Sequence, residues 1–540
     1  MRMYCRQIFL ALALLVSFTG QVLAAQDADN LKALTSQLIA ANYAEKEQLA
    51  GQIAALDDER VLPILSALLE GELFYKKDDE QILIVKGDAI NNAFSGDAVD
   101  VPGKRDKKKI GVNNSLRGEL RSLIARAQIN SRKESVRLDA AANLLKNSAD
   151  VELTLVNEAL AKETSSDVKD ILSLVRGLIL LKSEDQAERI TALELLDGSL
   201  YPEVRASLNQ FISGFSEEEI KTRKTEYTAA TKSLASIETL VEMNGYIENL
   251  YFGLALGAVL LLAAIGLAIT FGVMGVINMA HGEMIMLGAY TTYVVQQLMP
   301  DHTGLSLVVS IPAAFLVAGA VGVAIERGVI RHLYGRPLET LLATFGISLI
   351  LQQAVRSVFS PLNREVATPD WMAGTFMLNP ALELTWNRLY IIIFSLLVLA
   401  TLALVLKRTL FGLQMRAVTM NRPMASSMGI RTGWVDALTF GLGSGIAGIA
   451  GVALSQLTNV GPNLGQAYII DSFMVVVFGG VGNLWGTLVA AMSLGVANKI
   501  FEPIAGAVLA KILVLVFIIL FIQKRPRGLF ALKGRAVENG

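Results

Sequence analysis

The second half of the chain is dominated by long apolar stretches that carry almost no charge. No Asp, Glu, Lys or Arg occurs between Asn249 and Ala280, and similar gaps recur toward the C-terminus. A helix that crosses a bilayer needs about 20 apolar residues. We therefore predict an all-α, polytopic membrane domain with about nine spanning or re-entrant segments. These segments are 250–272, 274–298, 305–325, 340–359, 387–406, 435–457, 468–480, 484–500 and 504–522.

Two of these stretches, 468–480 and 484–500, are short for a span, and they flank the glycine-rich turn Gly479–Asn483. We interpret the pair as a broken or re-entrant element. Irregular backbone at membrane depth is tolerated only where protein or water satisfies its polar groups.

Basic residues gather in three of the connections and predict the orientation. They follow the third, the fifth and the last stretch, and the positive-inside rule places all three groups in the cytoplasm together with the C-terminus. The expected location is the inner membrane of a bacterium. The residues are Arg327, Arg331, Arg336, Lys407, Arg408, Arg416, Arg422, Arg431, Lys524, Arg525, Arg527, Lys533 and Arg535.

The first 25 residues have the pattern of a secretory signal peptide: a charged start, the apolar run Ile8–Phe18, and small residues around Ala24. We therefore expect 26–243 to be a periplasmic domain and 244–540 to be the transmembrane domain. Charged helical patterns fill 26–243, and 73–85 reads as a small β-hairpin. Valines at 136, 168 and 204 lie 32 and 36 residues apart, which favours HEAT-like helix pairs over the alternative, an irregular helical bundle.

Several kinds of site are excluded by the residue content. The single cysteine, Cys5, permits no internal disulfide, and three widely spaced histidines offer no helical metal pair. No segment has the phosphate-binding pattern G-x-x-x-x-G-K-[ST], so any ATP must be bound by another chain. With a net charge of -1 the chain has no basic face for nucleic acid. We interpret its densest basic run, Lys104 to Lys109, as a solvated loop.

Polar groups within the apolar region are the candidates for function, because lipid penalises them. Asn278, His281 and Glu283 begin the second stretch beside several glycines, and Asn483 follows a comparable turn. We predict that these four residues line a translocation pathway or gate. The alternative is a helix-packing turn near the cytoplasmic face, in which Glu283 is structurally paired.

Four ordered segments resemble the branched-chain amino-acid ABC permease family. They are GVINMAHGEMIMLGAY (275–290), RAVTMNRPMASSMGI (416–430), FGGVGNLWGT (478–487) and RPRGL (525–529). The resemblance covers roughly 245–535. It implies a permease that performs no bond chemistry, binds no cofactor and works with ATP-hydrolysing subunits, a sister permease and a periplasmic solute-binding protein. It further implies that 416–430 is the ATPase-coupling element, with Arg416, Asn421, Arg422, Met424 and Gly429 as its residues.

Within that family, a signal peptide followed by a HEAT-like domain resembles the B subunit of the urea-transporting permeases, so urea is the solute that this resemblance implies. A branched-chain amino acid is the alternative, in which case Glu283 faces the pore. The sequence leaves two other classes of protein open. An intramembrane hydrolase would need Ser444 within reach of His281, and a passive membrane anchor would need only one or two spans.

Overall fold

The computed structural model describes residues 30–56, 58–87, 89–99, 106–148 and 151–530. The predicted signal peptide at 1–25 and the basic residues 533 and 535 lie outside the described residues. Contacts divide the chain into two units, Met1–Thr239 and Leu240–Gly540. We call them the front unit and the membrane unit.

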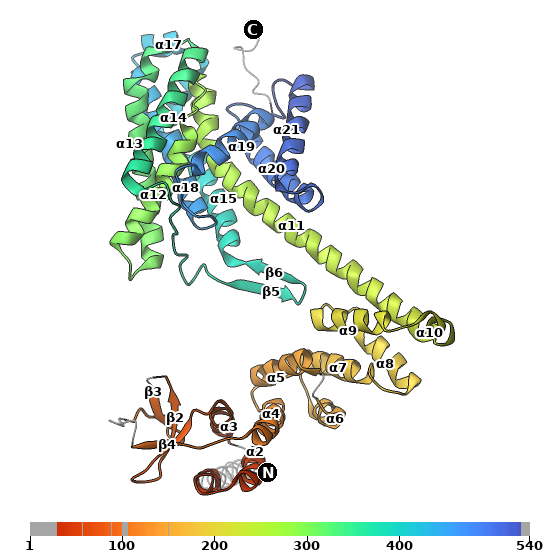
Figure 1. The fold of residues 1–540 in the computed structure, drawn as a ribbon. Helices are drawn as coiled ribbons and strands as arrows, with labels where there is room; N and C mark the ends of the chain where they lie inside the picture. The colour runs from red at the N-terminus through yellow and green to blue at the C-terminus, as the bar shows by residue number, and fades with distance from the viewer. Residues whose placement is uncertain (1–29, 57, 88, 100–105, 149–150, 531–540) are drawn as a thin grey trace, which may run out of the picture. The chain divides into compact units, whose positions relative to one another are not determined.

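The front unit begins with helices packed on a four-stranded sheet (Figure 1). The antiparallel strands are β1 (Leu73–Lys76), β2 (Ile82–Lys86), β3 (Ala89–Asn92) and β4 (Lys107–Lys109), in the order β3-β2-β1-β4. Apolar side chains of β1 and β2 share a buried core with the helices. The helices are α2 (Tyr43–Ala54), α3 (Val61–Glu70) and α4 (Asn114–Ile129).

The basic run was wrongly expected to be a loop over its last three residues. Lys107, Lys108 and Lys109 form β4, which pairs with β1 at the edge of the sheet. Exposed lysines suit an edge strand because their charge discourages pairing with another chain. β1 pairs with β2 along one edge, and the backbone N–H and C=O groups of its other edge pair with β4. Composition alone could not reveal that this second edge was open to pairing.

A series of helices completes the front unit: α5 (Glu134–Lys146), α6 (Leu153–Lys162), α7 (Ser166–Leu180), α8 (Gln186–Leu196), α9 (Pro202–Ser213) and α10 (Glu217–Thr222). The next helix, α11 (Lys224–Met274), runs on into the membrane unit. Val168 and Val204 are fully buried. The HEAT-like assignment of this series stays a prediction.

Two arginines in this series make the same set of contacts. Arg137, near the start of α5, donates from Nε and Nη2 to both carboxylate oxygens of Glu163 (2.8 and 3.0 Å) and from Nη1 to the Ser131 carbonyl (2.9 Å). Arg189, near the start of α8, does the same to Glu226 (2.7 and 3.0 Å) and to the carbonyl six residues before it (2.8 Å). The two arginines are 189 − 137 = 52 residues apart, a spacing that the valine pattern did not reveal.

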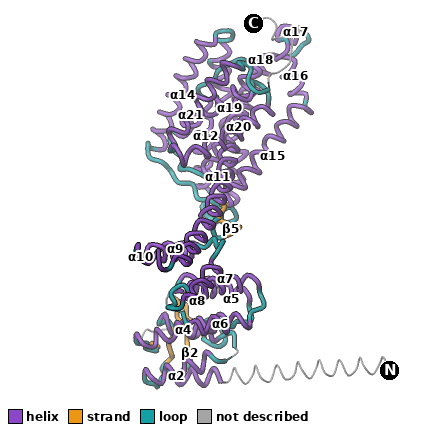
Figure 2. The backbone as a smooth tube through the Cα atoms, turned by 90° about the vertical axis from the view of Figure 1, so that its right-hand side faces the viewer, coloured by secondary structure: helices purple, strands orange, loops and turns teal. Residues whose placement is uncertain are grey.

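The membrane unit is a bundle in which each of the nine predicted stretches corresponds to one main helix (Figure 2). Beyond Met274, the stretch 274–298 becomes helical only at His281, and 504–522 begins in the last turn of one helix and continues as the next. Seven of these helices are long and apolar enough to cross a membrane. The two others are α12 and α19, which are shorter or less apolar. The predicted fold class is confirmed: a mostly helical, polytopic membrane domain. Beyond α11 the helices are α12 (His281–Leu298), α13 (Thr303–Gly328), α14 (Pro337–Phe359), α15 (Trp386–Arg408), α18 (Thr432–Ser455), α19 (Leu464–Gly479), α20 (Leu484–Ala505) and α21 (Ala507–Lys524).

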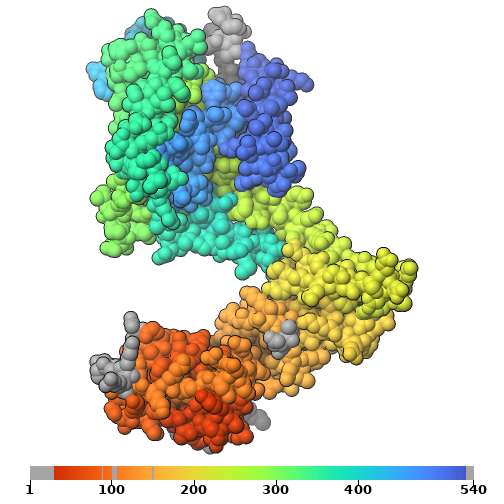
Figure 3. All heavy atoms as spheres, in the orientation of Figure 1, coloured from red at the N-terminus to blue at the C-terminus, as the bar shows by residue number. Residues whose placement is uncertain are grey.

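The centre of the bundle is α18, whose glycines let its neighbours approach closely. A Cβ built on Gly288 of α12 would lie 2.0 Å from the Gly448 carbonyl oxygen, and one on Gly448 would lie 2.6 Å from the Ala314 carbonyl of α13. Small residues permit such contacts between membrane helices. On the face of this unit that Figure 3 shows, α13 and α14 appear in green and α21 in dark blue.

The connection between α14 and α15 contains a second hairpin. Strands β5 (Thr375–Asn379) and β6 (Leu382–Thr385) pair antiparallel with a bulge. The hairpin is tied to α11 by a hydrogen bond from Asn379 to Asn244 (3.0 Å) and by one from the Tyr251 hydroxyl to the Thr385 carbonyl (2.6 Å). We call this end of the membrane unit the hairpin end. The short helices α16 (Leu410–Met420) and α17 (Arg422–Ser427) lie at the other end (Figure 1).

Candidate functional site

The helical path of the chain is broken between α11 and α12, where three candidate residues lie. Gly275 has φ +66°, a conformation that favours glycine, and 275–280 is not helical. The amides freed by the break find partners: the Ala280 N–H donates to Asn278 Oδ1 (3.0 Å) and the Met279 N–H donates to Thr344 Oγ1 (3.1 Å). Asn278 therefore shapes the break itself.

His281 opens α12 and is fully buried. Its Nε2 lies 2.8 Å from the Ala263 carbonyl oxygen of α11, and a Cβ on Gly266 would meet its ring at 2.8 Å. The hydrogen bond joins the two helices on either side of the break. A role of His281 in lining a pathway stays a prediction.

Glu283 is buried, and only one of its carboxylate oxygens is paired. Oε1 accepts hydrogen bonds from Ser348 Oγ (2.9 Å) and from Gln352 Nε2 (2.8 Å), both on α14. Oε2 has no hydrogen-bond partner among the described residues, although the side chain is only 1% exposed. Leaving a buried carboxylate oxygen unpaired is costly. Glu283 therefore has one oxygen that holds α12 to α14 and one that is free to accept a hydrogen bond.

The partners of Glu283 belong to a polar stripe that runs along α14. Thr340, Thr344, Ser348 and Gln352 are all buried and recur every fourth residue, and Arg356 continues the series. Side chains at i and i+4 lie on one face of a helix, and 16 residues rise about 24 Å, most of the thickness of a bilayer core. Apolar residues such as Leu342 and Leu349 are exposed. The helix thus turns its polar face inward, the reverse of a soluble surface helix.

The stripe ends at Arg356, whose Nη2 donates to Asn463 Oδ1 just before α19 (2.7 Å). Sequence analysis missed the stripe as a site, although its signal was readable as T-x3-T-x3-S-x3-Q-x3-R within an apolar segment. A search for polar residues at a spacing of four would have found it.

Asn483, the fourth pathway candidate, lies in a different turn. Its side chain caps α20 by accepting from the Trp485 and Gly486 N–H groups (3.1 and 3.2 Å), and it donates to the Phe530 carbonyl (3.3 Å). None of the hydrogen bonds given for the described residues joins it to Glu283 or α14. Asn278, His281 and Glu283 thus lie at one break and Asn483 at a second turn, which packs against the end of α11: a Cβ on Gly272 would lie 2.5 Å from the Gly482 Cα.

The predicted coupling residues lie on α16 and α17 and at the turns around them. Arg416 bonds the Leu406 carbonyl, Asn421 caps α17 by accepting from the Met424 N–H (3.0 Å), and Gly429 has φ +86°. Met424 is 60% exposed. Two further methionines, Met420 and Met428, are also exposed, so this segment presents several flexible apolar side chains.

Arg422, in contrast, is engaged within the chain. It forms an ion pair with the buried Asp436 of α18, and its guanidinium lies 4.4 Å from the ring centre of Tyr334. Burial, together with the Asp436 charge, raises the pKa of the Tyr334 hydroxyl above its ordinary value. Arg422 therefore fixes α17 on the start of α18 through one charge pair and one aromatic contact.

The pair that a hydrolase would need is not formed. Ser444 Oγ has no hydrogen-bond partner in the described part of the chain, and His281 uses Nε2 for the Ala263 carbonyl. A serine nucleophile requires its base within hydrogen-bond distance. Nor do three His, Cys, Asp or Glu side chains gather as metal ligands anywhere in the described ranges.

Comparisons with known proteins place the membrane unit in a family. Residues 249–522, about half of the chain, match the family model described as branched-chain amino acid transport system / permease component. The chain is 30% identical over 298 residues to the high-affinity branched-chain amino acid transport system permease protein BraD of Pseudomonas aeruginosa, covering 53% of this chain and 96% of that protein.

Two further relatives are similar. LivH of Escherichia coli K12, a permease protein of the same kind of system, is 29% identical over 294 residues, 53% of this chain and 95% of its own length. The probable branched-chain amino acid transport permease protein LivH of Methanocaldococcus jannaschii is 27% identical over 245 residues, 45% of this chain and 76% of its own length. No solved structure matches the chain.

Proposed function

The chain belongs to the family of branched-chain amino acid transport permeases, and we propose that it is the membrane-spanning subunit of an ATP-driven importer in a bacterial inner membrane. Its relatives are transport permease components and not enzymes. In our proposal the front unit is periplasmic and the C-terminus is cytoplasmic, as the distribution of basic residues favours.

The observation that supports a transport path is the polar stripe of α14 against Glu283. Buried polar groups within a membrane helix are costly, and where they persist they mark pathways or helix contacts. A series of hydroxyl and amide groups that rises about 24 Å offers a solute a succession of hydrogen-bonding partners. In our proposal the contact between α12 and α14 opens during the transport cycle, and Thr344, Ser348 and Gln352 then face the solute.

We propose that the solute is a branched-chain amino acid. Glu283 Oε2 is an unpaired acceptor for an ammonium group, and Arg356, one turn beyond Gln352, is a donor for a carboxylate. A zwitterion needs both charges on one path. The names of the relatives support the same solute.

Urea is the second candidate, and one observation favours it. The family model matches from residue 249 onward, beyond the front unit, and the two relatives align over nearly their whole length with only about half of this chain. The combination of a front domain with this family is what resembles the urea permeases. Urea is neutral, and the hydroxyl and amide groups of the stripe could bind it without help from the two charges.

The partners follow from the same proposal. The exposed methionines of α16 and α17 offer an adaptable apolar surface to an ATP-binding subunit on the cytoplasmic side. A sister permease completes the pore, and a periplasmic binding protein delivers the solute. The chain itself binds no cofactor, and ATP is hydrolysed by the partner subunits.

Uptake measurements test the proposal. Labelled leucine and labelled urea, each at micromolar concentration, would be offered to cells with and without the gene, with the unlabelled compounds as competitors. Gene-dependent leucine uptake that leucine alone blocks supports the amino-acid importer. Gene-dependent urea uptake that urea alone blocks identifies urea instead. Loss of neither uptake would contradict both solutes.

The variant Glu283→Gln separates the solutes within one site. It keeps an acceptor and the shape of the side chain but removes the charge that an ammonium group needs. We expect it to abolish amino-acid uptake and to preserve at least half of urea uptake. Leu342→Ala, on the exposed face of the same helix α14, is the matched control and should leave either uptake unchanged.

A further inference from the structure

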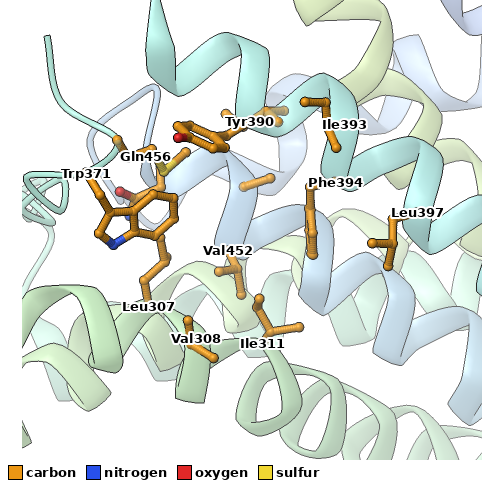
Figure 4. A pocket seen from close by; sticks show the side chains of 13 residues that line it. Leu307, Val308, Ile311, Trp371, Tyr390, Ile393, Phe394, Leu397, Val452 and Gln456 are labelled. Atoms are coloured by element: carbon orange, nitrogen blue, oxygen red, sulfur yellow. The ribbon is translucent and has the colours of Figure 1, made fainter. Parts of the chain in front are cut away.

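A cavity of about 250 Å³ opens between α13, α15 and α18 (Figure 4), and none of the described residues that line it belongs to α14. Its wall is made by side chains from the first turns of α13 and α15, the last turns of α18, and the connection 360–374. Apart from Gln456, it is lined by apolar and aromatic residues. The main ones are Leu307, Ile311, Trp371, Tyr390, Phe394 and Val452.

The cavity opens sideways, toward the surface that lipid covers. Val308 of α13 and Ile393 and Leu397 of α15 line it and are 55%, 53% and 59% exposed. Both helices are among those long and apolar enough to cross a membrane. Deeper in the wall, Ile391 and Val452 are only 2% exposed. The opening therefore leads from the lipid-facing surface of two spans inward to a third.

Aromatic rings mark the hairpin end of the cavity. Trp371 packs edge-on against Tyr390, with ring centres 5.1 Å apart, and its Nε1 lies so close to Gly304 that a Cβ there would meet it at 2.9 Å. Trp386 continues the cluster at 6.2 Å from Tyr390. Tryptophan and tyrosine gather at the level of lipid headgroups, so the cavity reaches from that level into the acyl-chain region.

One polar atom at this end has no partner. Gln456, at the end of α18, is 6% exposed and lines the cavity beside Trp371 and Tyr390 (Figure 4). Its Nε2 donates to Ser455 Oγ (3.3 Å), but its Oε1 has no hydrogen-bond partner within the described residues. A buried acceptor of this kind calls for a donor from outside the chain.

We propose that this cavity binds one phospholipid from the adjacent leaflet, with an acyl chain between α13 and α15 and a hydrogen-bond donor of its headgroup at Gln456 Oε1. The apolar wall suits the acyl chain, and the aromatic end suits the headgroup region. The lateral opening lets the lipid enter from the bilayer. The proposed topology makes this the periplasmic leaflet. A hydroxyl of phosphatidylglycerol and an ammonium of phosphatidylethanolamine are both suitable donors.

Photocrosslinking of the full-length chain, assembled with its partner subunits, tests the site. The importer is reconstituted in vesicles of phosphatidylethanolamine and phosphatidylglycerol in which one of the two carries a photoreactive acyl chain, and adducts are mapped by peptide mass spectrometry. We expect adducts on Ile311, Phe394 and Val452. Running each labelled lipid in turn identifies which headgroup is held.

Two variants fill the cavity and one serves as control. Ala453→Phe adds a ring at the inner wall, and Val308→Phe adds one at the open mouth, where the fold has room for it. Either ring excludes at least two methylene groups, so we expect the adducts to fall at least about tenfold. Ala320→Phe, on an exposed position of α13, should leave them unchanged.

Two outcomes would overturn the proposal. One is labelling confined to exposed positions such as Leu316 and Leu404, which ordinary surrounding lipid would contact. The other is crosslinking of the cavity residues to the sister permease instead of to lipid. Recovery of the assembled complex shows that each variant folds, so an unfolded variant cannot imitate the expected loss.

Discussion

Two buried carboxylates of the front unit and one of the membrane unit differ in how their oxygens are paired. In the front unit, Glu163 and Glu226 each have both carboxylate oxygens bonded to an arginine. In the membrane unit, Glu283 has one oxygen bonded to neutral donors and the other unpaired. All three carboxylates are buried. They differ in whether an oxygen remains that can accept a further hydrogen bond.

Glu163 and Glu226 hold helices together with both oxygens paired, which avoids the free-energy cost of an unpaired buried oxygen. A charge that serves a solute must keep a free acceptor until the solute arrives. The bidentate arginine pairs fix helices of the front unit, whereas one oxygen of Glu283 has no hydrogen-bond partner among the described residues.

The largest expected effect is on the front unit. Arg137→Ala leaves Glu163 buried without its partner, and we expect the free energy of unfolding of this unit to fall by about 3–5 kcal/mol. Hydrogen exchange of the α5 to α7 amides in the full-length chain measures the loss, with the exposed Arg121→Ala as control. A loss below that of the control would contradict the structural role of the pair.

Arg189→Ala sharpens the same comparison. Glu226 also accepts from Arg223 Nη2 (2.5 Å), so a second guanidinium remains after the change. We expect a smaller loss of stability than for Arg137→Ala, in the same hydrogen-exchange measurement on α8 and the start of α11. An equal or larger loss would mean that Arg223 does not compensate.

The next effect concerns transport. Glu283→Ala removes the free acceptor and also unpairs Ser348 and Gln352, so we expect uptake of the transported solute to fall about 100-fold, since a hydrogen bond to a charged group contributes up to about 3 kcal/mol. Ser348→Ala removes one donor only and should cost less than tenfold. Unimpaired uptake by the Glu283→Ala variant, with equal amounts of protein in the membrane, would contradict a role of the unpaired Glu283 oxygen in transport.

A smaller effect is expected at the other end of the membrane unit. Arg422→Ala releases α17 from Asp436 and Tyr334, and we expect solute-stimulated ATP hydrolysis by the reconstituted importer to fall about tenfold, as loss of a partly exposed charge pair and its aromatic contact would produce. Arg408→Ala, at an exposed position, is the matched control. Stimulated hydrolysis at the control level would show that Arg422 does not couple the two processes.

The smallest effect appears only in acid. Hydrogen bonds from Arg137, and further ones from the Thr164 and Ser165 N–H groups, lower the pKa of Glu163 to about 2. Because the folded-state pKa lies below the unfolded value of about 4.3, the stability from this group is complete above that value and is lost as the pH falls toward 2. Glu163→Gln should remove this part of the acid dependence, measured by hydrogen exchange of α5 to α7. Acid dependence identical to that of the unchanged chain would contradict it.

The sequence by itself predicted where the membrane helices lie. Charge-free stretches of the right length must be helical in lipid, because only an intact helix satisfies its own backbone there. Lipid also penalises polar side chains, and this identified Asn278, His281 and Glu283 as candidates for a functional or structural role. A pattern of local composition was sufficient for both.

Only the tertiary structure decided which of these polar groups meet. Glu283 and Ser348 are 65 residues apart, and Arg137 and Glu163 are 26 apart, and nothing in local composition pairs them. The edge of β1 that recruits Lys107–Lys109, and the hairpin β5–β6, likewise depend on a neighbouring backbone. Hydrophobicity and helix geometry act locally, whereas the partner of a buried polar group is chosen by packing between segments distant in sequence.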